Sequence, residues 1–248
     1  MKKKDGLHFY LPMTLLRIFL EKISDTVKVS DREILRHISA RRLSEGDKII
    51  VCDGNGDVYL YRIKERNYTG VLLERIEPVE ISLPLRNIIY AQALLRPKKL
   101  EPIVSYSTQF GVESFVFFVS KRSSVRDLDI VKKRLERLRK VAIASAEISM
   151  NKVPRIEIVP DLPTLLEQFN NYKPLLLYEN AQERLNLEWL KSNDIRDVLF
   201  IIGPEGGFED EEVELVRERG GHILSLGERI LTSEVAGFVV LSLLQFGI

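Results

Sequence analysis

The sequence is poor in metal-binding and redox-active side chains, with one cysteine, Cys52, and three histidines among 248 residues. A single thiol excludes an internal disulfide framework and a thiolate metal cluster, and the histidines are isolated in sequence, so no metal is expected. The chain also lacks an apolar run long enough to cross a bilayer, and its first lysines are not followed by the apolar stretch of a signal peptide. These absences predict a cytoplasmic protein with no membrane partner.

The charges are balanced in total but not in distribution. The chain has 37 Lys and Arg against 36 Asp and Glu, yet residues 1–75 hold 15 basic and 11 acidic side chains, and the remainder holds 22 and 25. The N-terminal third therefore carries a charge of +4 and the rest −3. This asymmetry favours a module that faces a polyanion, joined to a part with a different task.

The spacing of apolar residues changes between residues 75 and 84, which divides the chain into predicted domains 1–75 and 76–248. Within 41–76, short β-branched and aromatic runs alternate with glycines, as in β-hairpins. A helix is predicted before them at 30–43, with Ser30 or Asp31 as its N-cap. Beyond residue 84, apolar strands alternate with helices, which predicts a mainly parallel sheet covered on both faces. The predicted helices lie near 100–110, 125–149, 162–171, 209–219 and 232–246, and the strands at 87–95, 113–119, 155–159, 174–179, 197–202 and 222–227.

The segment "FIIGPEGGF" (200–208) reads as a buried strand that stops in a glycine-rich loop. A phosphate-binding loop needs backbone N–H groups and usually a lysine at a helix N-terminus. Here four carboxylates, Glu209, Asp210, Glu211 and Glu212, follow the loop instead and would repel a phosphate. A neutral or cationic cofactor suits the loop better, and the simplest alternative is a turn that only ends the strand.

A second loop with the same placement, "LGERILTSEVAG" (226–237), follows another predicted strand and opens the last helix, with Thr232 or Ser233 available as N-cap. In parallel sheets, ligands bind beyond the carboxyl ends of the strands. Together with "LLLYE", the two loops could therefore line one pocket, in which backbone groups would contact an adenine edge.

These two loops resemble the C-terminal signature of the RsmE family, the 16S rRNA uracil-N3 methyltransferases of the SPOUT superfamily. "HFYL" (8–11), "ILRHISARRLSEGD" (34–47) and "STQFGVESFVFFVSKRS" (107–123) extend the resemblance along the chain. The resemblance implies a PUA-like small β-barrel, then an α/β SPOUT domain with a C-terminal trefoil knot, the knot and cofactor site lying within about 174–248. It also implies a homodimer whose substrate is small-subunit ribosomal RNA, free or in the assembled subunit.

The resemblance further implies S-adenosylmethionine as cofactor. Carried over position by position, its binding residues are Leu177, Tyr178, Ile202, Gly203, Pro204, Glu205, Gly207, Leu226, Gly227, Ile230 and Leu231. Uracil N3 must lose a proton before it can attack a methyl group. Our hypothesis assigns Arg229 to stabilise the developing anion and Glu234 or Glu205 to accept the proton. The alternative is a structural ion pair between Arg229 and Glu234.

Basic side chains of the N-terminal domain are candidates for phosphate contacts, and a solvated charged surface is the alternative. With one residue of the second domain, the predicted RNA-binding set is Arg32, Arg36, Arg41, Arg42, Lys48 and Arg122. Because N3 lies on the Watson–Crick edge, the target uridine must be unpaired or flipped out of its stack.

The chain departs from the family pattern at polar positions, among them Tyr106, Gln109, Asn151 and Thr232. The departures leave the cofactor loops nearly intact and alter residues expected near the RNA. Two alternatives to the leading hypothesis therefore stay open: a non-catalytic RNA-binding or ribosome-associated protein, and a methyltransferase with another target base. A nucleotide-phosphate hydrolase is disfavoured by the acidic start of the helix after residue 208.

Overall fold

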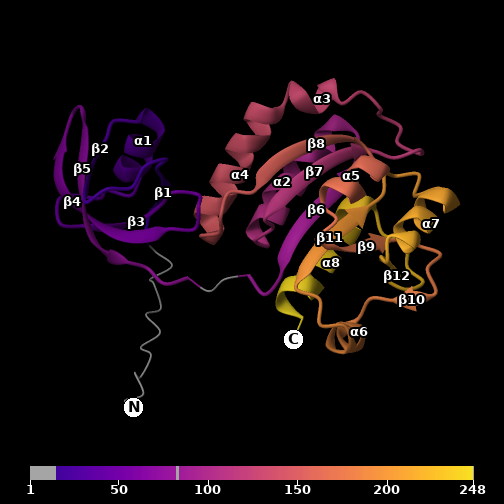
Figure 1. The fold of residues 1–248 in the computed structure, drawn as a ribbon. Coiled ribbons are helices and arrows are strands. Elements are labelled where there is room, and N and C mark those ends of the chain that lie inside the picture. The colour runs from indigo at the N-terminus through magenta and orange to yellow at the C-terminus, as the bar shows by residue number, and fades with distance from the viewer. Residues whose placement is uncertain (1–14, 82–83, 248) are drawn as a thin grey trace, which may run out of the picture. The chain divides into compact units, whose positions relative to one another are not determined.

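The computed structural model describes residues 15–81 and 84–247 (Figure 1). The chain forms two compact units, Met1–Ile81 and Ser82–Ile248. The "HFYL" segment lies outside the described residues, while the domain functions assigned from the sequence and the trefoil knot stay predictions.

The first unit is a five-stranded sheet with one helix. Its elements are β1 (Arg17–Phe19), β2 (Thr26–Val29), α1 (Arg32–Ala40), β3 (Lys48–Cys52), β4 (Val58–Asn67) and β5 (Gly70–Pro78). The strand order is β1-β3-β4-β5-β2, and the antiparallel pairs β3–β4 and β4–β5 confirm the predicted hairpins. The edge strands β1 and β2 do not pair with each other among the described residues, so the sheet is a half-barrel rather than a closed barrel. The short strands β1 and β2 were not predicted from the sequence.

The helix α1 begins where its sequence predicts a cap. The carboxylate of Asp31 accepts hydrogen bonds from the backbone N–H groups of Glu33 and Ile34, which would otherwise be unpaired at the helix start. Ile38 is fully buried against the sheet. The opposite face of α1, with its arginines, is left to solvent.

The second unit is a seven-stranded sheet in the order β10-β12-β9-β11-β6-β7-β8, in which every strand pair is parallel. Its elements are β6 (Asn87–Ala93), η1 (Pro97–Lys99), α2 (Leu100–Gln109), β7 (Ser114–Val119), α3 (Asp129–Lys132), α4 (Leu135–Ser149), β8 (Arg155–Asp161), α5 (Leu162–Gln168), β9 (Lys173–Leu177), β10 (Glu183–Arg184), α6 (Leu187–Ser192), β11 (Asp197–Ile202), α7 (Asp210–Glu218), β12 (His222–Ser225) and α8 (Ser233–Phe246). The predicted α/β fold with a mainly parallel sheet is confirmed.

Two hydrophobic cores lie on opposite faces of this sheet. In β6, Ile88 and Tyr90 join a cluster with α2, α4, α6 and α8, whereas Ile89 and Ala91 join a cluster with α5 and α7. Successive side chains of a strand point to opposite faces, so a strand buried on both sides reads as a continuous apolar run. This explains why "NIIYAQA" and "SFVFFV" show no alternation of apolar and polar residues.

The single long helix predicted at 125–149 is wrong. Residues 129–149 form a one-turn helix, α3, and a longer one, α4, separated at Lys133 and Arg134. At the break the Arg134 N–H bonds the carbonyl of Val131, three residues back, as in a tight 3₁₀ turn. No proline or glycine marks this position, and Val131 and Leu138 are buried on either side of it, so apolar spacing alone predicts one helix.

The last helix, α8, is held against β6 at close range. Arg86 and Gln245 exchange two hydrogen bonds of 3.1 Å, between the backbone of the first and the side-chain amide of the second. The Arg86 guanidinium also donates to the carbonyl of Ile195 at 3.0 Å. Nearer the start of α8, a Cβ added at Gly237 would lie 2.2 Å from the Tyr90 hydroxyl. Within residues 15–81 and 84–247 no helix is both long and apolar enough to span a membrane.

We expect Gly237→Ala to lower the free energy of unfolding by about 1–3 kcal/mol, because the new methyl group overpacks the contact with Tyr90. In an unconstrained helix the same change would raise stability by about 1 kcal/mol. Urea unfolding measures the difference. The control is the double variant Tyr90→Phe/Gly237→Ala, which should lose less than the sum of the two single variants. Strict additivity, or stabilisation by Gly237→Ala, would contradict the tight contact.

Candidate functional site

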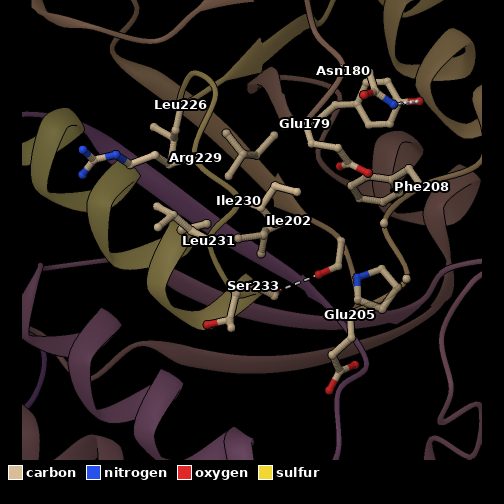
Figure 2. A pocket seen from close by; sticks show the side chains of 18 of the residues that line it. Glu179, Asn180, Ile202, Glu205, Phe208, Leu226, Arg229, Ile230, Leu231 and Ser233 are labelled. Atoms are coloured by element: carbon tan, nitrogen blue, oxygen red, sulfur yellow. Dashed lines mark hydrogen bonds between the residues drawn. The ribbon is translucent and has the colours of Figure 1, made fainter.

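A cavity of about 590 Å³ lies beyond the carboxyl ends of three neighbouring strands, β9, β11 and β12 (Figure 2). Its wall comes mainly from the segments that follow these strands, residues 177–180, 202–208 and 226–233. Every residue predicted to bind the cofactor lines it: Leu177, Tyr178, Ile202, Gly203, Pro204, Glu205, Gly207, Leu226, Gly227, Ile230 and Leu231. The prediction that these loops form one pocket is confirmed, and their role in binding a cofactor stays a prediction.

The glycine loop after β11 is shaped by close contacts that a larger residue would block. A Cβ at Gly203 would lie 3.0 Å from the ring of Phe208, which is buried beneath the loop. Gly207 has φ +72°, a conformation that glycine adopts without strain, and a Cβ there would lie 2.9 Å from a carboxylate oxygen of Glu179. The loop is therefore a close-packed part of the pocket wall as well as the end of a strand.

Two hydrogen bonds to one carbonyl connect this loop to the start of α8 and to β6. The Ser233 hydroxyl donates to the Gly203 carbonyl at 2.7 Å, and the Gln92 amide donates to the same carbonyl at 3.2 Å. The Gln92 amide is also 3.0 Å from the Ser233 hydroxyl. Gln92 is fully buried in β6, opposite Ile202 in β11. Thr232 occupies the N-cap position of α8, but its side chain does not cap the helix.

Sequence reasoning missed Gln92 because it lies inside a strand that is otherwise apolar. Its position gives a usable signal, since a fully buried amide needs hydrogen-bond partners, and the carboxyl end of a central strand is where a parallel sheet places its ligands.

A lysine lies between two carboxylates at one margin of the cavity. Lys99 Nζ is 3.4 Å from Glu205 Oε1 and 3.1 Å from Glu234 Oε2. Burial lowers the pKa of the Lys99 ammonium, but the two carboxylates outweigh this effect and hold that pKa above its usual value. Burial raises the pKa of Glu234, and hydrogen bonds from its own backbone and from Lys99 bring it below the usual value. Sequence reasoning also missed Lys99, which lies in η1, the short helix after the carboxyl end of β6.

The structure separates Arg229 from these acids. Arg229 lines the cavity but is exposed, and Figure 2 shows its side chain directed away from Glu205. Among the described residues, Glu234 has its ion pair with Lys99 and none with Arg229. The predicted alternative of an Arg229–Glu234 ion pair is therefore wrong, because Lys99, distant in sequence, occupies the position next to Glu234. The catalytic roles assigned to Arg229, Glu205 and Glu234 stay predictions.

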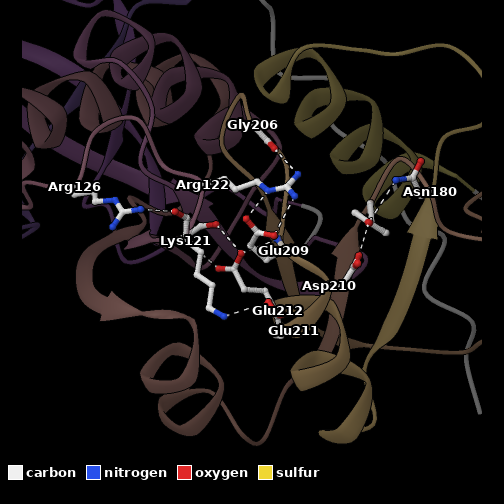
Figure 3. A network of polar contacts seen from close by, with 11 residues as sticks. Lys121, Arg122, Arg126, Asn180, Gly206, Glu209, Asp210, Glu211 and Glu212 are labelled. Atoms are coloured by element: carbon white, nitrogen blue, oxygen red, sulfur yellow. Dashed lines mark hydrogen bonds and ion pairs between the residues drawn. The ribbon is translucent and has the colours of Figure 1, made fainter.

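The acidic turn after the glycine loop, Glu209–Glu212, contacts the segment that follows β7 (Figure 3). Glu212 is buried and accepts hydrogen bonds from Ser120 Oγ at 3.1 Å, Lys121 N at 3.0 Å and Glu209 N at 3.0 Å. Three donors to one carboxylate compensate for its burial. Asp210 accepts a hydrogen bond from the Tyr178 hydroxyl, Glu211 pairs with Lys121 and Glu209 with Arg122. All four carboxylates that made a phosphate site implausible are thus in contact with protein groups.

Arg122 binds both the acidic turn and the glycine loop. Its guanidinium contacts both carboxylate oxygens of Glu209, at 2.9 and 3.0 Å, and donates to the Gly206 carbonyl at 3.3 Å. The hydrogen bond from Arg122 to Glu209 lowers the pKa of this carboxyl. The structure therefore gives Arg122 a place in the support of the pocket, and the RNA contact predicted for it stays a prediction.

The other residues predicted to contact RNA lie in the first unit and are exposed. Four of them belong to α1 or to the turn directly after it, and one lies on β3: Arg32, Arg36, Arg41, Arg42 and Lys48. Arg42 has φ +55°, which places it in the turn that ends the helix. Four of the five thus lie on one short helix and the turn after it, and their RNA contact stays a prediction.

Comparison with known proteins identifies both parts of the chain. Residues 82–245 match the family model of an RNA methyltransferase domain, and residues 29–73 match that of an RNA methyltransferase PUA domain. The ribosomal RNA small subunit methyltransferase E of Bacillus subtilis is 29% identical over 89% of this chain and 90% of its own length. That of Mesomycoplasma hyopneumoniae is 27% identical over 92% and 98%.

A solved structure with a bound ligand is also similar. It is the ribosomal RNA small subunit methyltransferase E of Neisseria gonorrhoeae bound to S-adenosyl methionine, with a TM-score of 0.78, 25% identity, and coverage of 92% of this chain and 95% of the other.

We expect Glu212→Gln to lower the free energy of unfolding by about 2–4 kcal/mol, because the amide nitrogen would face donors and leave them unpaired in a buried site. Urea unfolding measures the loss. Glu211→Gln is the matched control: Glu211 is exposed and pairs with Lys121 at 3.3 Å, so this change should cost less than about 1 kcal/mol. Equal losses in the two variants would show that Glu212 does not support the loop.

Proposed function

The chain belongs to the RsmE family of RNA methyltransferases, and we propose that it methylates N3 of a uridine in 16S ribosomal RNA, with S-adenosylmethionine as methyl donor. The observation that carries this proposal is the cavity at the ends of β9, β11 and β12, because every position carried over from the family's cofactor site lines it. The basic residues of α1 and the match to an RNA methyltransferase PUA domain support an RNA substrate.

The cavity suits S-adenosylmethionine in size and chemistry. Its volume of about 590 Å³ lies within the range of small-molecule sites, and Leu177, Ile202, Leu226 and Leu231 give it apolar walls. Gly203, Gly206 and Gly207 line it without side chains, which leaves room for backbone contacts with the edge of an adenine. The bound cofactor would supply an electrophilic methyl group on a positively charged sulfur.

The acids of the cavity favour a cationic ligand over a phosphate. Glu179, Glu205 and Glu228 line it, against two basic side chains, Lys99 and Arg229. Opposite charge within a few ångströms stabilises a sulfonium, whereas a phosphate would meet a negative wall. This balance supports the preference for a cationic cofactor that the sequence indicates.

The residues of the chain act on the proton and on the charge of the target base. Uracil N3 carries a proton at neutral pH, and its loss leaves a negative charge on the ring. We propose that Glu205 or Glu234 accepts this proton and that Arg229, exposed at the rim of the cavity, stabilises the charge from the solvent side.

The rest of the substrate lies outside the cavity. We propose that Arg32, Arg36, Arg41, Arg42 and Lys48, and with them Arg122, contact phosphates and supply salt-dependent affinity. The target uridine must be unpaired or flipped, since its N3 is otherwise hydrogen-bonded within a duplex. We place the reaction in the cytoplasm, with free ribosomal RNA or the assembled small subunit as substrate.

An exposed apolar stripe on α8 supports a homodimer. Val235, Val239 and Phe246 of α8 are 38–65% exposed at helical spacing. Tyr106 of α2, 49% exposed, stacks edge-on against Phe238 beside them. Apolar residues gathered on one face of a helix are typical of a protein interface. We propose that a second copy of the chain covers this stripe.

A methyl-transfer assay tests the proposed function. We expect the protein to transfer methyl groups to small ribosomal subunits that lack the modification, and nucleoside analysis of the RNA should find 3-methyluridine. Arg229→Ala should abolish transfer and leave S-adenosylmethionine affinity, measured by calorimetry, nearly unchanged. Cofactor binding without any transfer would favour a non-catalytic RNA-binding protein, and another methylated nucleoside would show a different target base.

Val239→Glu should convert the proposed homodimer to a monomer, because it buries a charge without a partner in the interface. Sedimentation equilibrium measures the mass. Ala144→Glu, which adds the same charge at an exposed position of α4, is the control and should leave the mass unchanged. A monomeric wild-type protein, or a dimer that persists in Val239→Glu, would contradict the proposed interface.

A further inference from the structure

We propose that Lys99 is a catalytic residue that, with Glu205, recognises the edge of the target base: its ammonium donates a hydrogen bond to a uracil carbonyl while Glu205 accepts the N3 proton. Glu234 acts as a positioning residue that holds Lys99. This proposal rests on the proposed function, since it requires uracil N3 as the site of methylation, and it adds a residue that the sequence did not indicate.

The geometry gives Lys99 a free donor at the cavity. An ammonium has three N–H groups, and in the part of the chain that the structure describes two carboxylates account for two of them, Glu205 at 3.4 Å and Glu234 at 3.1 Å. The Lys99 side chain is 21% exposed, and both Lys99 and Glu205 line the cavity, whereas Glu234 does not. A base at this margin would therefore meet a donor and an acceptor side by side.

The chemistry of uracil matches this pair. Its Watson–Crick edge presents a carbonyl acceptor on either side of the N3–H donor, so an adjacent donor and acceptor on the protein complement half of the edge. Cytosine has no proton on N3, and Glu205 would then face a lone pair. The pair therefore favours uracil over cytosine before any chemistry occurs, because two acceptors held opposite each other have no hydrogen bond between them.

The same pair assists removal of the proton. When the N3–H bond breaks, its electron pair stays on the base and the charge spreads onto the neighbouring carbonyl oxygens, while the proton passes to the Glu205 carboxylate and then to solvent. An ammonium at one of these oxygens stabilises the anion and lowers the pKa of N3. The methyl group then bonds to N3, and its bond to sulfur breaks with the electron pair left on a neutral thioether.

Glu234 keeps the ammonium in this position from a different element. It belongs to the first turn of α8, and its carboxylate is 26% exposed beside Lys99. The groups that face Lys99 are thus Glu205 from the loop after β11 and Glu234 from α8, while buried Tyr90 of β6 is near Glu234. Two carboxylates around one ammonium leave the cluster with a net negative charge, so a proton acceptor remains after one ion pair is formed.

The test compares Lys99→Met with the matched control Lys98→Met, which removes the same charge from the exposed neighbouring side chain. Transfer to small subunits is followed as 3-methyluridine from pH 6.5 to 9.5, with S-adenosylmethionine affinity from calorimetry. We expect kcat of Lys99→Met to fall about 100- to 1000-fold at pH 7.5, the loss typical of one removed electrostatic donor. Cofactor affinity should stay within about threefold of that of the control.

The pH profile separates this role from a structural one. Without the cation the pKa of N3 is higher, so the anionic fraction at neutral pH falls, and the rate of Lys99→Met should rise about tenfold per pH unit. The rate of Lys98→Met should follow the flatter profile of the wild type. Lys99→Arg keeps a charged donor and should recover at least tenfold of the activity lost in Lys99→Met. Glu205→Gln should lose more activity than Glu234→Gln, because only Glu205 accepts the proton.

Several results would overturn the proposal. They are a kcat of Lys99→Met within threefold of that of Lys98→Met, a loss independent of pH, or a loss matched by an equal fall in cofactor affinity. If Lys99→Met does not fold, Lys99→Arg takes its place in the test. Failure of Lys99→Arg to show the expected activity and pH profile would then overturn the proposal equally. Absence of 3-methyluridine with the wild-type protein would instead refute the proposed function itself, and the two failures are therefore distinguishable.

Discussion

The carbonyl oxygen of Gly203 is the point on which the pocket depends. It accepts hydrogen bonds from Ser233, at the start of α8, and from Gln92, inside β6. These residues come from three segments that are far apart in the chain, and their contact fixes the glycine loop, the last helix and the central strand relative to one another. Because Gln92 is fully buried, water cannot replace this contact. Breaking it would leave a buried polar group unpaired. The cavity wall is therefore held by polar contacts within an otherwise apolar sheet.

The carboxylates around the pocket differ in function because they differ in partners. Glu212 is buried with three donors and supports the loop, while Glu209 binds Arg122 through both oxygens. Glu205 and Glu234 share one lysine, which leaves a carboxylate with less than full compensation next to the cavity. In the sequence these four glutamates look alike, since each lies in or shortly after one of the two loops. Their burial and their cations, Arg122 from the segment after β7 and Lys99 from η1, decide which carboxylate is structural and which is available for chemistry.

The parts of the fold that sequence could predict are those set by local periodicity. Continuous apolar runs bounded by glycine predicted the parallel strands and the two loops, and a cap at Ser30 or Asp31 predicted the start of α1. What could not be predicted rests on long-range contacts. Lys99 lies more than a hundred residues before Glu205 and Glu234. The sequence therefore suggested Arg229, the basic residue nearest to Glu234, as the partner of Glu234. The break between α3 and α4 also has no local signal, since no proline or glycine marks it and the buried Val131 and Leu138 on either side keep the spacing of one helix. The short strands β1 and β2 depend on pairing with β3 and β5 across the sheet.

The first residues of α8 connect the two tasks of the proposed site. Ser233 holds the loop that would surround the methyl donor, and Glu234, the next residue, holds the lysine that would contact the methyl acceptor. Consecutive residues of a helix turn their side chains in different directions, so one helix start can contact two neighbouring segments at once. The helix itself is fixed further along, where Gly237 allows close approach to Tyr90 and Gln245 pairs with Arg86. The alignment of donor and acceptor, on which the rate of methyl transfer depends, is thereby tied to the packing of a single helix against β6.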